Sequence, residues 1–125
     1  MKRIISTPNA PQAIGPYSQA VEANGFVFVS GQIPIVPATG QMPDGIEAQT
    51  EQVMRNIGAI LEAAGLTYSN VVKTTVLLKS IADFATMNGI YAKYFTADCP
   101  ARAAFEVAAL PKGALIEVEV IACKN

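Results

Sequence analysis

Two strand-like stretches at the C-terminal end constrain the fold of this chain more than any other feature. Residues 102–110 and 115–123 flank a Pro-Lys-Gly turn. In the second stretch, residues of an all-apolar set alternate with residues of a set that mixes apolar side chains and glutamates. Alternation with a period of two places successive side chains on opposite faces of a strand. We therefore predict an antiparallel hairpin. The side chains expected to face a core are Ile116, Val118, Val120 and Ala122. Those expected on the other face are Leu115, Glu117, Glu119 and Ile121, joined by Ala104, Ala108 and Leu110 from the first strand.

The rest of the chain divides into further strands and two helices. Asn24-Gly25 lies between two short apolar stretches and is typical of a tight hairpin turn. Segments rich in proline and glycine, at 8–16 and 34–45, are expected to be loops. The remaining predicted strands span residues 3–6, 20–23, 26–30 and 71–79.

Both predicted helices have recognisable ends and an apolar face. Asp44 near the start and Gly65 just past the end are expected to cap the first helix. Ser80 is expected to be the N-cap of the second, with Asp83 completing an approximate capping box. The apolar face of the first helix consists of Ile46, Val53, Met54, Ile57, Ile60, Leu61 and Ala64. That of the second consists of Ile81, Phe84, Met87, Tyr91 and Phe95.

The order of these elements predicts an α+β fold. A mostly antiparallel sheet with both helices on one face is the simplest arrangement. A length of 125 residues is enough for a single domain spanning 1–125. The other face of the sheet is too apolar to be left in water, so we expect the chain to self-associate through it.

Composition excludes several classes of function. The chain has no histidine, which excludes Ser-His-Asp and Cys-His hydrolase mechanisms and histidine zinc sites. A net charge of −1 without a Lys/Arg cluster argues against nucleic acid as a partner. No apolar run approaches the ~20 residues of a membrane span, and no signal peptide is recognisable, so we expect a cytoplasmic protein. Cys99 and Cys123 are expected to be free thiols.

Arg102 is the strongest candidate for ligand binding. The chain has three arginines; Arg3 lies at the N-terminus and Arg55 in a predicted helix, whereas the third stands among small residues at a strand start. A planar guanidinium can clamp a substrate carboxylate through two parallel hydrogen bonds. Glu117 is the candidate to handle a proton or a water. The alternatives are a surface ion pair between Arg102 and Asp98, and a merely solvated strand carboxylate.

Four motifs occur in order along nearly the whole chain. They are A-I-G-P-Y-S-Q (13–19), V-S-G-Q-I-P (29–34), V-V-K-T-T-V (71–76) and P-A-R-A-A-F-E-V-A-A-L-P-K-G-A-L-I-E-V-E (100–119). This set resembles the Rid family, the reactive intermediate deaminases, and specifically its RidA branch. The resemblance implies a homotrimer with a chorismate-mutase-like fold, in which the sheets form a central barrel and ligand clefts lie between subunits. It also implies hydrolysis of 2-aminoacrylate, 2-iminopropanoate and 2-iminobutanoate to 2-oxo acids and ammonia, without a cofactor or metal.

The same resemblance implies roles for individual residues. Arg102 would grip the substrate carboxylate, and Glu117 would orient or activate the attacking water. The positions implied to bind substrate are Tyr17, Ser30, Gly31, Asn88 and Ala104. Many relatives have cysteine at the last of these positions, where the contacts are implied to run through the backbone. Alanine there should preserve binding and remove any thiol chemistry.

Two classes of function remain open on the sequence. One is an imine and enamine deaminase, and the other is a non-catalytic trimer that binds small carboxylates or a regulatory partner. Arg102 favours the enzyme, because deaminase activity is doubtful in branches of the family that lack this arginine. In the predicted hairpin Ala108 lies opposite Glu117, which puts Arg102 about 20 Å from Glu117 at ~3.3 Å per residue. We therefore expect the cleft to be shared between chains.

Overall fold

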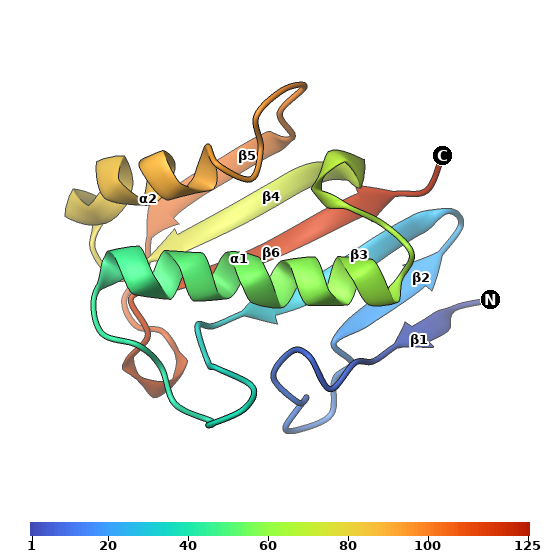
Figure 1. The fold of residues 1–125 in the computed structure, drawn as a ribbon, viewed down its shortest axis with the longest axis horizontal. Coiled ribbons are helices and arrows are strands. Elements are labelled where there is room, and N and C mark those ends of the chain that lie inside the picture. Colours follow the sequence, from blue (N-terminus) through green and yellow to red (C-terminus); the bar gives the residue numbers. More distant parts are fainter.

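The computed structural model describes all 125 residues and contains one six-stranded sheet with two helices packed on one face (Figure 1). The helices are α1 (Ile46–Ala63) and α2 (Phe84–Tyr91). The short 3-10 helices are η1 (Tyr68–Asn70), η2 (Ile81–Asp83) and η3 (Pro111–Gly113). The strands are β1 (Arg3–Ile5), β2 (Ala20–Ala23), β3 (Phe26–Gln32), β4 (Val71–Leu78), β5 (Ala101–Glu106) and β6 (Ile116–Cys123). The α+β prediction is confirmed.

The strand order is β1-β2-β3-β6-β4-β5, and it corrects the predicted C-terminal hairpin. Strand β4 lies between β5 and β6, so these two never pair. Four of the neighbouring pairs are antiparallel and the β4–β5 pair is parallel. Strand β5 ends at Glu106, and residues 107–115 form a loop containing η3 in place of a tight turn. The backbone N–H groups of Val107 and Lys79 bond to Leu78 and Leu115 respectively, which fixes this loop against the end of β4.

The register places Arg102 and Glu117 on opposite faces of the sheet. Thr74 of β4 lies opposite Arg102, and Leu77 lies opposite Glu117. The two residues are therefore two strands and three positions apart, about 14 Å at standard strand spacings, rather than 20 Å. Paired residues share a face. Thr74 faces the helices and is fully buried, whereas Leu77 belongs to the opposite set of β4.

The core lies between the sheet and the helices. The four β6 side chains predicted to face inwards, Ile116, Val118, Val120 and Ala122, are at most 2% exposed. They pack with Ile57, Ile60 and Leu61 of α1 in a single apolar cluster. Ala104 was predicted on the outer face, and that prediction is wrong. Because β5 pairs in parallel with β4, Ala104 lies opposite Val76 and packs against this cluster.

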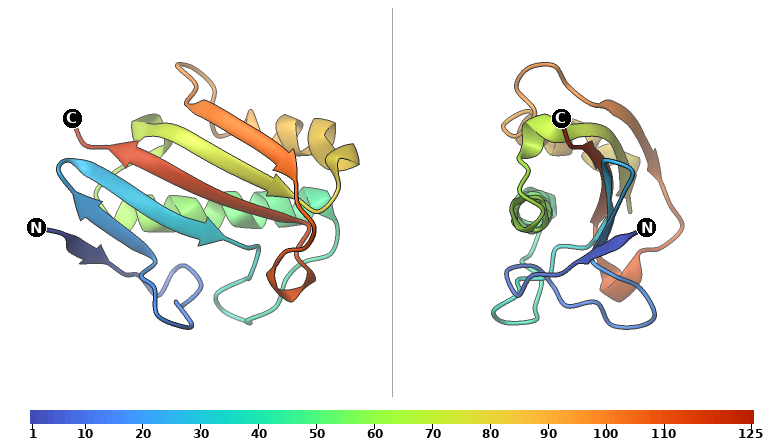
Figure 2. Two further views of the ribbon diagram at one scale, coloured as in Figure 1. Left: turned by 180° about the vertical axis from the view of Figure 1, so that it is seen from behind. Right: turned by 90° about the vertical axis from the view of Figure 1, so that its right-hand side faces the viewer.

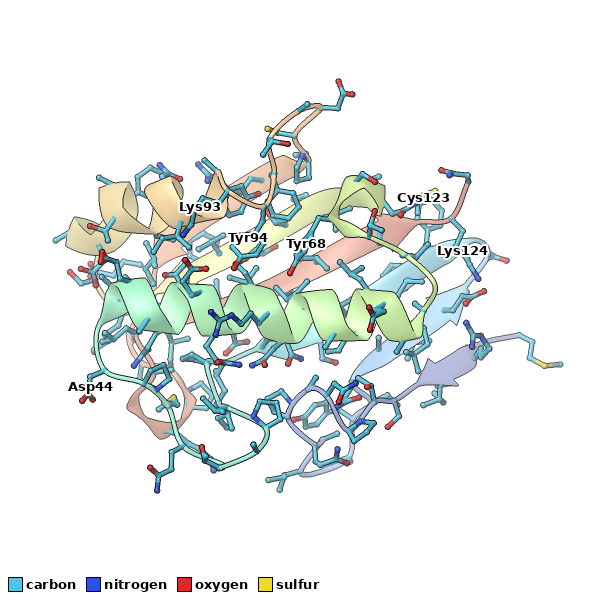
Figure 3. All side chains as sticks on the ribbon, viewed as in Figure 1. Asp44, Tyr68, Lys93, Tyr94, Cys123 and Lys124 are labelled. Carbon is cyan, nitrogen blue, oxygen red and sulfur yellow. The ribbon has the colours of Figure 1, made fainter.

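The predicted helix ends are confirmed only at the C-terminus of α1. The predicted Ser80 N-cap and Asp83 capping box of the second helix are wrong, because the N-cap of α2 is Asp83, without a side-chain hydrogen bond. Gly65 follows α1 with φ +77°, a left-handed conformation that favours glycine. The N-cap of α1 is Gly45 without a side-chain cap, so Asp44 does not cap the helix, and it lies on the preceding loop (Figure 3). Ser80 accepts a hydrogen bond from the Ala82 N–H and so caps the short 3-10 helix η2, which precedes α2. Ile81 lies on this turn and is 50% exposed, so it is not part of the buried stripe.

Residues just beyond the C-terminal end of α2 bind to α1. Glu51 of α1 forms an ion pair with Lys93 and accepts a hydrogen bond from the Tyr94 hydroxyl. The Tyr94 ring packs against the Tyr68 ring at a tilted angle, with their centroids 5.1 Å apart, and both side chains lie beside α1 (Figure 3). Tyr68 in turn donates a 2.5 Å hydrogen bond to the Met54 carbonyl. These contacts fix the position of α2 over β4 and β5.

The face of the sheet away from the helices has no covering layer (Figure 2). Three phenylalanines on this outer face, Phe26, Phe28 and Phe105, are each more than 40% exposed. Val27 and Val29, the neighbours of Phe26 and Phe28 along β3, are buried in the core, as the alternating burial of this strand shows. Neither helix is both long and apolar enough to cross a membrane.

Candidate active site

Five of the seven predicted site residues line two different pockets. Tyr17, Gly31 and Glu117 line a cavity of about 440 Å³ formed by the N-terminal loop, the end of β3 and η3. Asn88 and Arg102 line a more open pocket of about 520 Å³ between α2 and the start of β5. We call these the glutamate pocket and the arginine pocket. Arg102 lies on the face of the sheet that the helices cover, and Glu117 lies on the other face.

Helix α2 holds the Arg102 guanidinium. Its Nη1 donates a 2.6 Å hydrogen bond to Oδ1 of Asn88. Its Cζ lies 5.3 Å from the ring centroid of Phe84 and 4.9 Å from that of Tyr91, within the range of cation–π attraction. Arg102 takes part in none of the three ion pairs of the chain, so the alternative of a pair with Asp98 is wrong.

Tyr91 provides a rigid surface on which the Arg102 guanidinium packs. The side chain is 8% exposed, and its hydroxyl shares a 2.8 Å hydrogen bond with the Thr74 hydroxyl. Burial raises the pKa of the Tyr91 phenol, so the group is neutral at physiological pH. The guanidinium therefore packs on an uncharged, immobile ring and keeps its full positive charge for a ligand.

Glu117 is a half-buried carboxylate without a partner in its own chain. It forms no hydrogen bond and no ion pair. Burial raises the pKa of its carboxyl group, and the neighbouring Glu119 carboxylate raises it further. A carboxylate with a raised pKa is more basic than usual, which suits a group that takes a proton from water.

Gly31 leaves the space in which the Glu117 carboxylate lies. A Cβ on Gly31 would overlap Oε2 of Glu117 and lie 2.9 Å from its carboxyl carbon. Gly31 does not have a positive φ, so its backbone conformation does not require glycine. The absence of a side chain at this position therefore serves the close approach of the carboxylate.

Of the remaining predicted residues, Tyr17 lines the glutamate pocket, whereas Ser30 and Ala104 line neither pocket. Tyr17 is 52% exposed at the mouth of the glutamate pocket, and its N–H bonds to the Gly15 carbonyl. Ser30 lines neither pocket; its hydroxyl donates a 2.6 Å hydrogen bond to the Ser18 carbonyl and so holds the loop before β2. Ala104 lies on the core side of β5 and lines neither pocket.

Sequence reasoning missed the residues that support the two pockets. Gln19 at the back of the glutamate pocket is 3% exposed, and its amide binds the backbone of Thr7, Ala10 and Pro11. It is the last residue of the first family motif, which was the available signal. The roles of Phe84 and Tyr91 could have been found from helical spacing, since both share the face of Asn88.

The two cysteines are free, as predicted. Cys99 is exposed at the edge of the arginine pocket, and Cys123 is partly buried at the end of β6. No group of three His, Cys, Asp or Glu side chains lies close enough to hold a metal ion.

Comparison with known proteins relates the chain to one family. A family model described as Endoribonuclease L-PSP matches residues 7–124. The chain is 55% identical over 122 residues to chloroplastic Reactive Intermediate Deaminase A of Arabidopsis thaliana, covering 97% of this chain and 65% of that protein. It is 53% identical to the human 2-iminobutanoate/2-iminopropanoate deaminase, covering 100% of this chain and 92% of the relative. Among solved structures, a Rid-family protein of unknown function from Yersinia pestis is similar with a TM-score of 0.97 and 53% identity, covering 98% and 99% of the two chains.

Proposed function

The chain belongs to the Endoribonuclease L-PSP family, and nearly all of it is similar to proteins named as deaminases of reactive intermediates or of 2-imino acids. On this basis we propose that it hydrolyses reactive imines derived from amino acids. The proposed substrates are 2-iminopropanoate, its enamine tautomer 2-aminoacrylate, and 2-iminobutanoate. The products are the corresponding 2-oxo acids and ammonia. The observation that carries the proposal is a pair of charged groups that have no ion-pair partner in the chain. One is the Arg102 guanidinium, whose orientation Asn88 fixes, and the other is the Glu117 carboxylate, whose pKa is raised.

The chemistry requires little beyond positioning. The carbon of a protonated imine beside a carboxylate is already electrophilic. Arg102 would bind the substrate carboxylate, and Glu117 would remove a proton from water as its oxygen bonds to that carbon. Glu117 then returns that proton to the amine nitrogen of the tetrahedral carbinolamine, which expels ammonia as its hydroxyl group loses a proton to solvent and becomes the C=O group. Positioning and one general base are sufficient for such a step, with the proton transfer contributing roughly 10²–10⁴-fold.

We also propose that the active site forms between subunits of a homotrimer. Arg102 and Glu117 lie about 14 Å apart on opposite faces of one sheet, which is too far for one three-carbon substrate. A neighbouring chain can bring a second copy of either group to the first. The exposed phenylalanines of the outer face provide an apolar surface for that association.

A coupled assay tests the proposed activity. A serine dehydratase generates 2-aminoacrylate, and semicarbazide traps the imine that forms from it. We expect this protein to lower the amount of trapped product and to speed the appearance of pyruvate. A non-catalytic binding protein would leave the rate of pyruvate formation unchanged at substoichiometric protein concentration.

A further inference from the structure

The Arg102 side chain is held by residues that share one face of α2. Phe84, Asn88 and Tyr91 follow one another at spacings of four and three, so their side chains lie in a row along the helix. The two rings contact the guanidinium and Asn88 accepts its hydrogen bond. An exposed arginine on an edge strand would otherwise sample many rotamers.

The hydrogen bond to Asn88 determines which edge of the guanidinium is free. The group has five N–H donors, and only Nη1 donates to Asn88. The edge formed by Nη2 and Nε has no partner in the chain and matches the two oxygens of a carboxylate. Holding Nη1 therefore fixes the plane in which a carboxylate must approach.

The amide at position 88 holds the guanidinium without neutralising it. An aspartate there would accept the same hydrogen bond, but its negative charge would compete with a substrate carboxylate for Arg102. No acidic side chain forms an ion pair with Arg102. The pocket thus combines a fixed orientation with an uncompensated positive charge.

We propose that Asn88 is a positioning residue that acts through Arg102, by fixing the guanidinium plane for carboxylate binding. The inference rests on the proposed role of Arg102 in binding imine substrates. It assigns Asn88 no contact with the reacting atoms. Because the carboxylate is bound alike in the ground state and the transition state, loss of this positioning should raise KM and leave kcat nearly unchanged.

Two substitutions of similar size separate the hydrogen bond from the charge. Asn88→Leu removes the acceptor, and we expect KM to rise roughly five- to twentyfold with kcat changed less than about twofold. Asn88→Asp keeps the acceptor and adds a charge, so it should keep Arg102 ordered while also raising KM. Asn88→Ala replaces the leucine variant if that one does not fold, since alanine favours a helix. Thr86→Val, at an exposed position of the same helix, is the matched control and should change neither parameter.

Arginine NMR measures the positioning without any enzyme assay. The chain has only three arginines, so its ¹⁵Nε spectrum contains three side-chain signals that single substitutions assign. We expect the heteronuclear NOE of Arg102 Nε to indicate an ordered side chain in the wild type and in Asn88→Asp. It should fall to the level of a mobile side chain in Asn88→Leu. An Arg102 signal that stays equally ordered in Asn88→Leu would overturn the inference.

A double-mutant cycle tests whether Asn88 acts only through the arginine. In an Arg102→Lys background, Asn88→Leu should have little further effect on KM or on the affinity for pyruvate, the proposed product. Additive effects would show that Asn88 acts separately and would contradict the inference. If the wild type hydrolyses no imine, the proposed function is wrong, and the NMR and pyruvate measurements still decide whether Asn88 positions Arg102 for a carboxylate.

Discussion

Arg102 is the residue on which the proposed function depends most directly. Removing its charge-assisted contact in Arg102→Ala should cost about 1.5–3 kcal/mol, or roughly ten- to a hundredfold in kcat/KM. Arg102→Lys should recover little of this, because an ammonium cannot form the two parallel hydrogen bonds or stack on both rings. The semicarbazide assay on folded protein measures both variants. Activity like that of the wild type in Arg102→Ala would refute the assignment.

Glu117 predicts how the activity depends on pH. The ordinary pKa of a glutamate is 4.5, and burial together with Glu119 raises that of Glu117 above this value. A general base works only when it is ionised, so kcat/KM should fall as pH decreases through the raised pKa. Glu117→Gln should lose this acidic limb together with roughly 10²–10⁴-fold of the rate. An unchanged pH profile in this variant would assign the base to another group.

The same shift in pKa has a consequence for stability. The native carboxyl binds its proton more tightly than the unfolded one, so its stabilising contribution is complete below 4.5 and is lost as pH rises through the raised pKa. Relative to the wild type, Glu117→Gln should therefore gain free energy of unfolding as pH rises. Urea unfolding of the wild type and of Glu117→Gln, at pH values below and above this range, measures the difference in their free energies of unfolding.

Gly31 allows the position of the carboxylate to be tested without removing it. In Gly31→Ala the new Cβ overlaps the end of the Glu117 side chain, which can rotate away. We expect kcat/KM to fall roughly tenfold to a hundredfold while the free energy of unfolding changes by less than about 1 kcal/mol. Gly89→Ala is the matched control, because a Cβ there meets no atom within 4 Å. Equal activity in the two variants would contradict the proposed role of the Gly31 contact.

Gly58 in helix α1 is a glycine at which substitution by alanine should destabilise the fold rather than stabilise it. Alanine in place of glycine inside a helix normally stabilises by about 0.5–1 kcal/mol, as we expect for Gly89→Ala in α2. At Gly58 a Cβ would overlap the Tyr68 hydroxyl and lie 2.9 Å from its ring carbon Cζ. The Tyr68 hydroxyl is hydrogen-bonded to the Met54 carbonyl, and its ring packs against Tyr94 and Phe95, so the ring cannot move freely. Gly58→Ala should therefore lower the midpoint of thermal unfolding, and a rise like that of Gly89→Ala would show that the ring adjusts.

Local patterns in the sequence predicted most elements, because each depends on neighbours along the chain. The alternation in β6, the Asn24-Gly25 turn and the left-handed Gly65 all appear in the fold as expected. The failures arose where distant segments compete. The Pro-Lys-Gly turn suggested that β5 and β6 pair, but β4 lies between them and takes β5 as a parallel neighbour. No local pattern at residues 102–110 distinguishes the two partners.

The candidate site was predictable only as a set of residues. The motifs identified Arg102 and Glu117, and the structure gives both the environment of an unneutralised functional group. Their placement on opposite faces could not be read from the sequence, because it follows from the parallel pairing of β5. The expectation of a shared cleft rested on a wrong hairpin register. The correct register supports the same expectation for a different reason.

The outer face of the sheet determines what the whole molecule is expected to do in solution. It exposes Phe26, Phe28 and Phe105, and no helix covers it (Figure 2). Burying large apolar side chains stabilises an assembly by roughly 25 cal/mol per Å². Closed cyclic symmetry would make every cleft equivalent and leave no apolar face free. These features, with the resemblance to the Rid family, lead us to expect a trimer in which the sheets face a central axis.

Mixed assemblies test the shared site and the trimer together. Light scattering should give the mass of three chains for the wild type, for Arg102→Ala and for Glu117→Ala. Each variant alone should be nearly inactive, since every cleft lacks one group. When the two variants are unfolded and refolded together, some clefts combine an intact Arg102 from one chain with an intact Glu117 from another, and part of the activity should return. Mixing the folded variants without unfolding is the control and should restore nothing if subunits do not exchange. A monomeric protein, or co-refolded trimers that recover no activity, would mean that both groups of each site come from one chain. The separation of about 14 Å across the sheet does not permit this. Either result would therefore contradict the assignment of Arg102 and Glu117 to one active site.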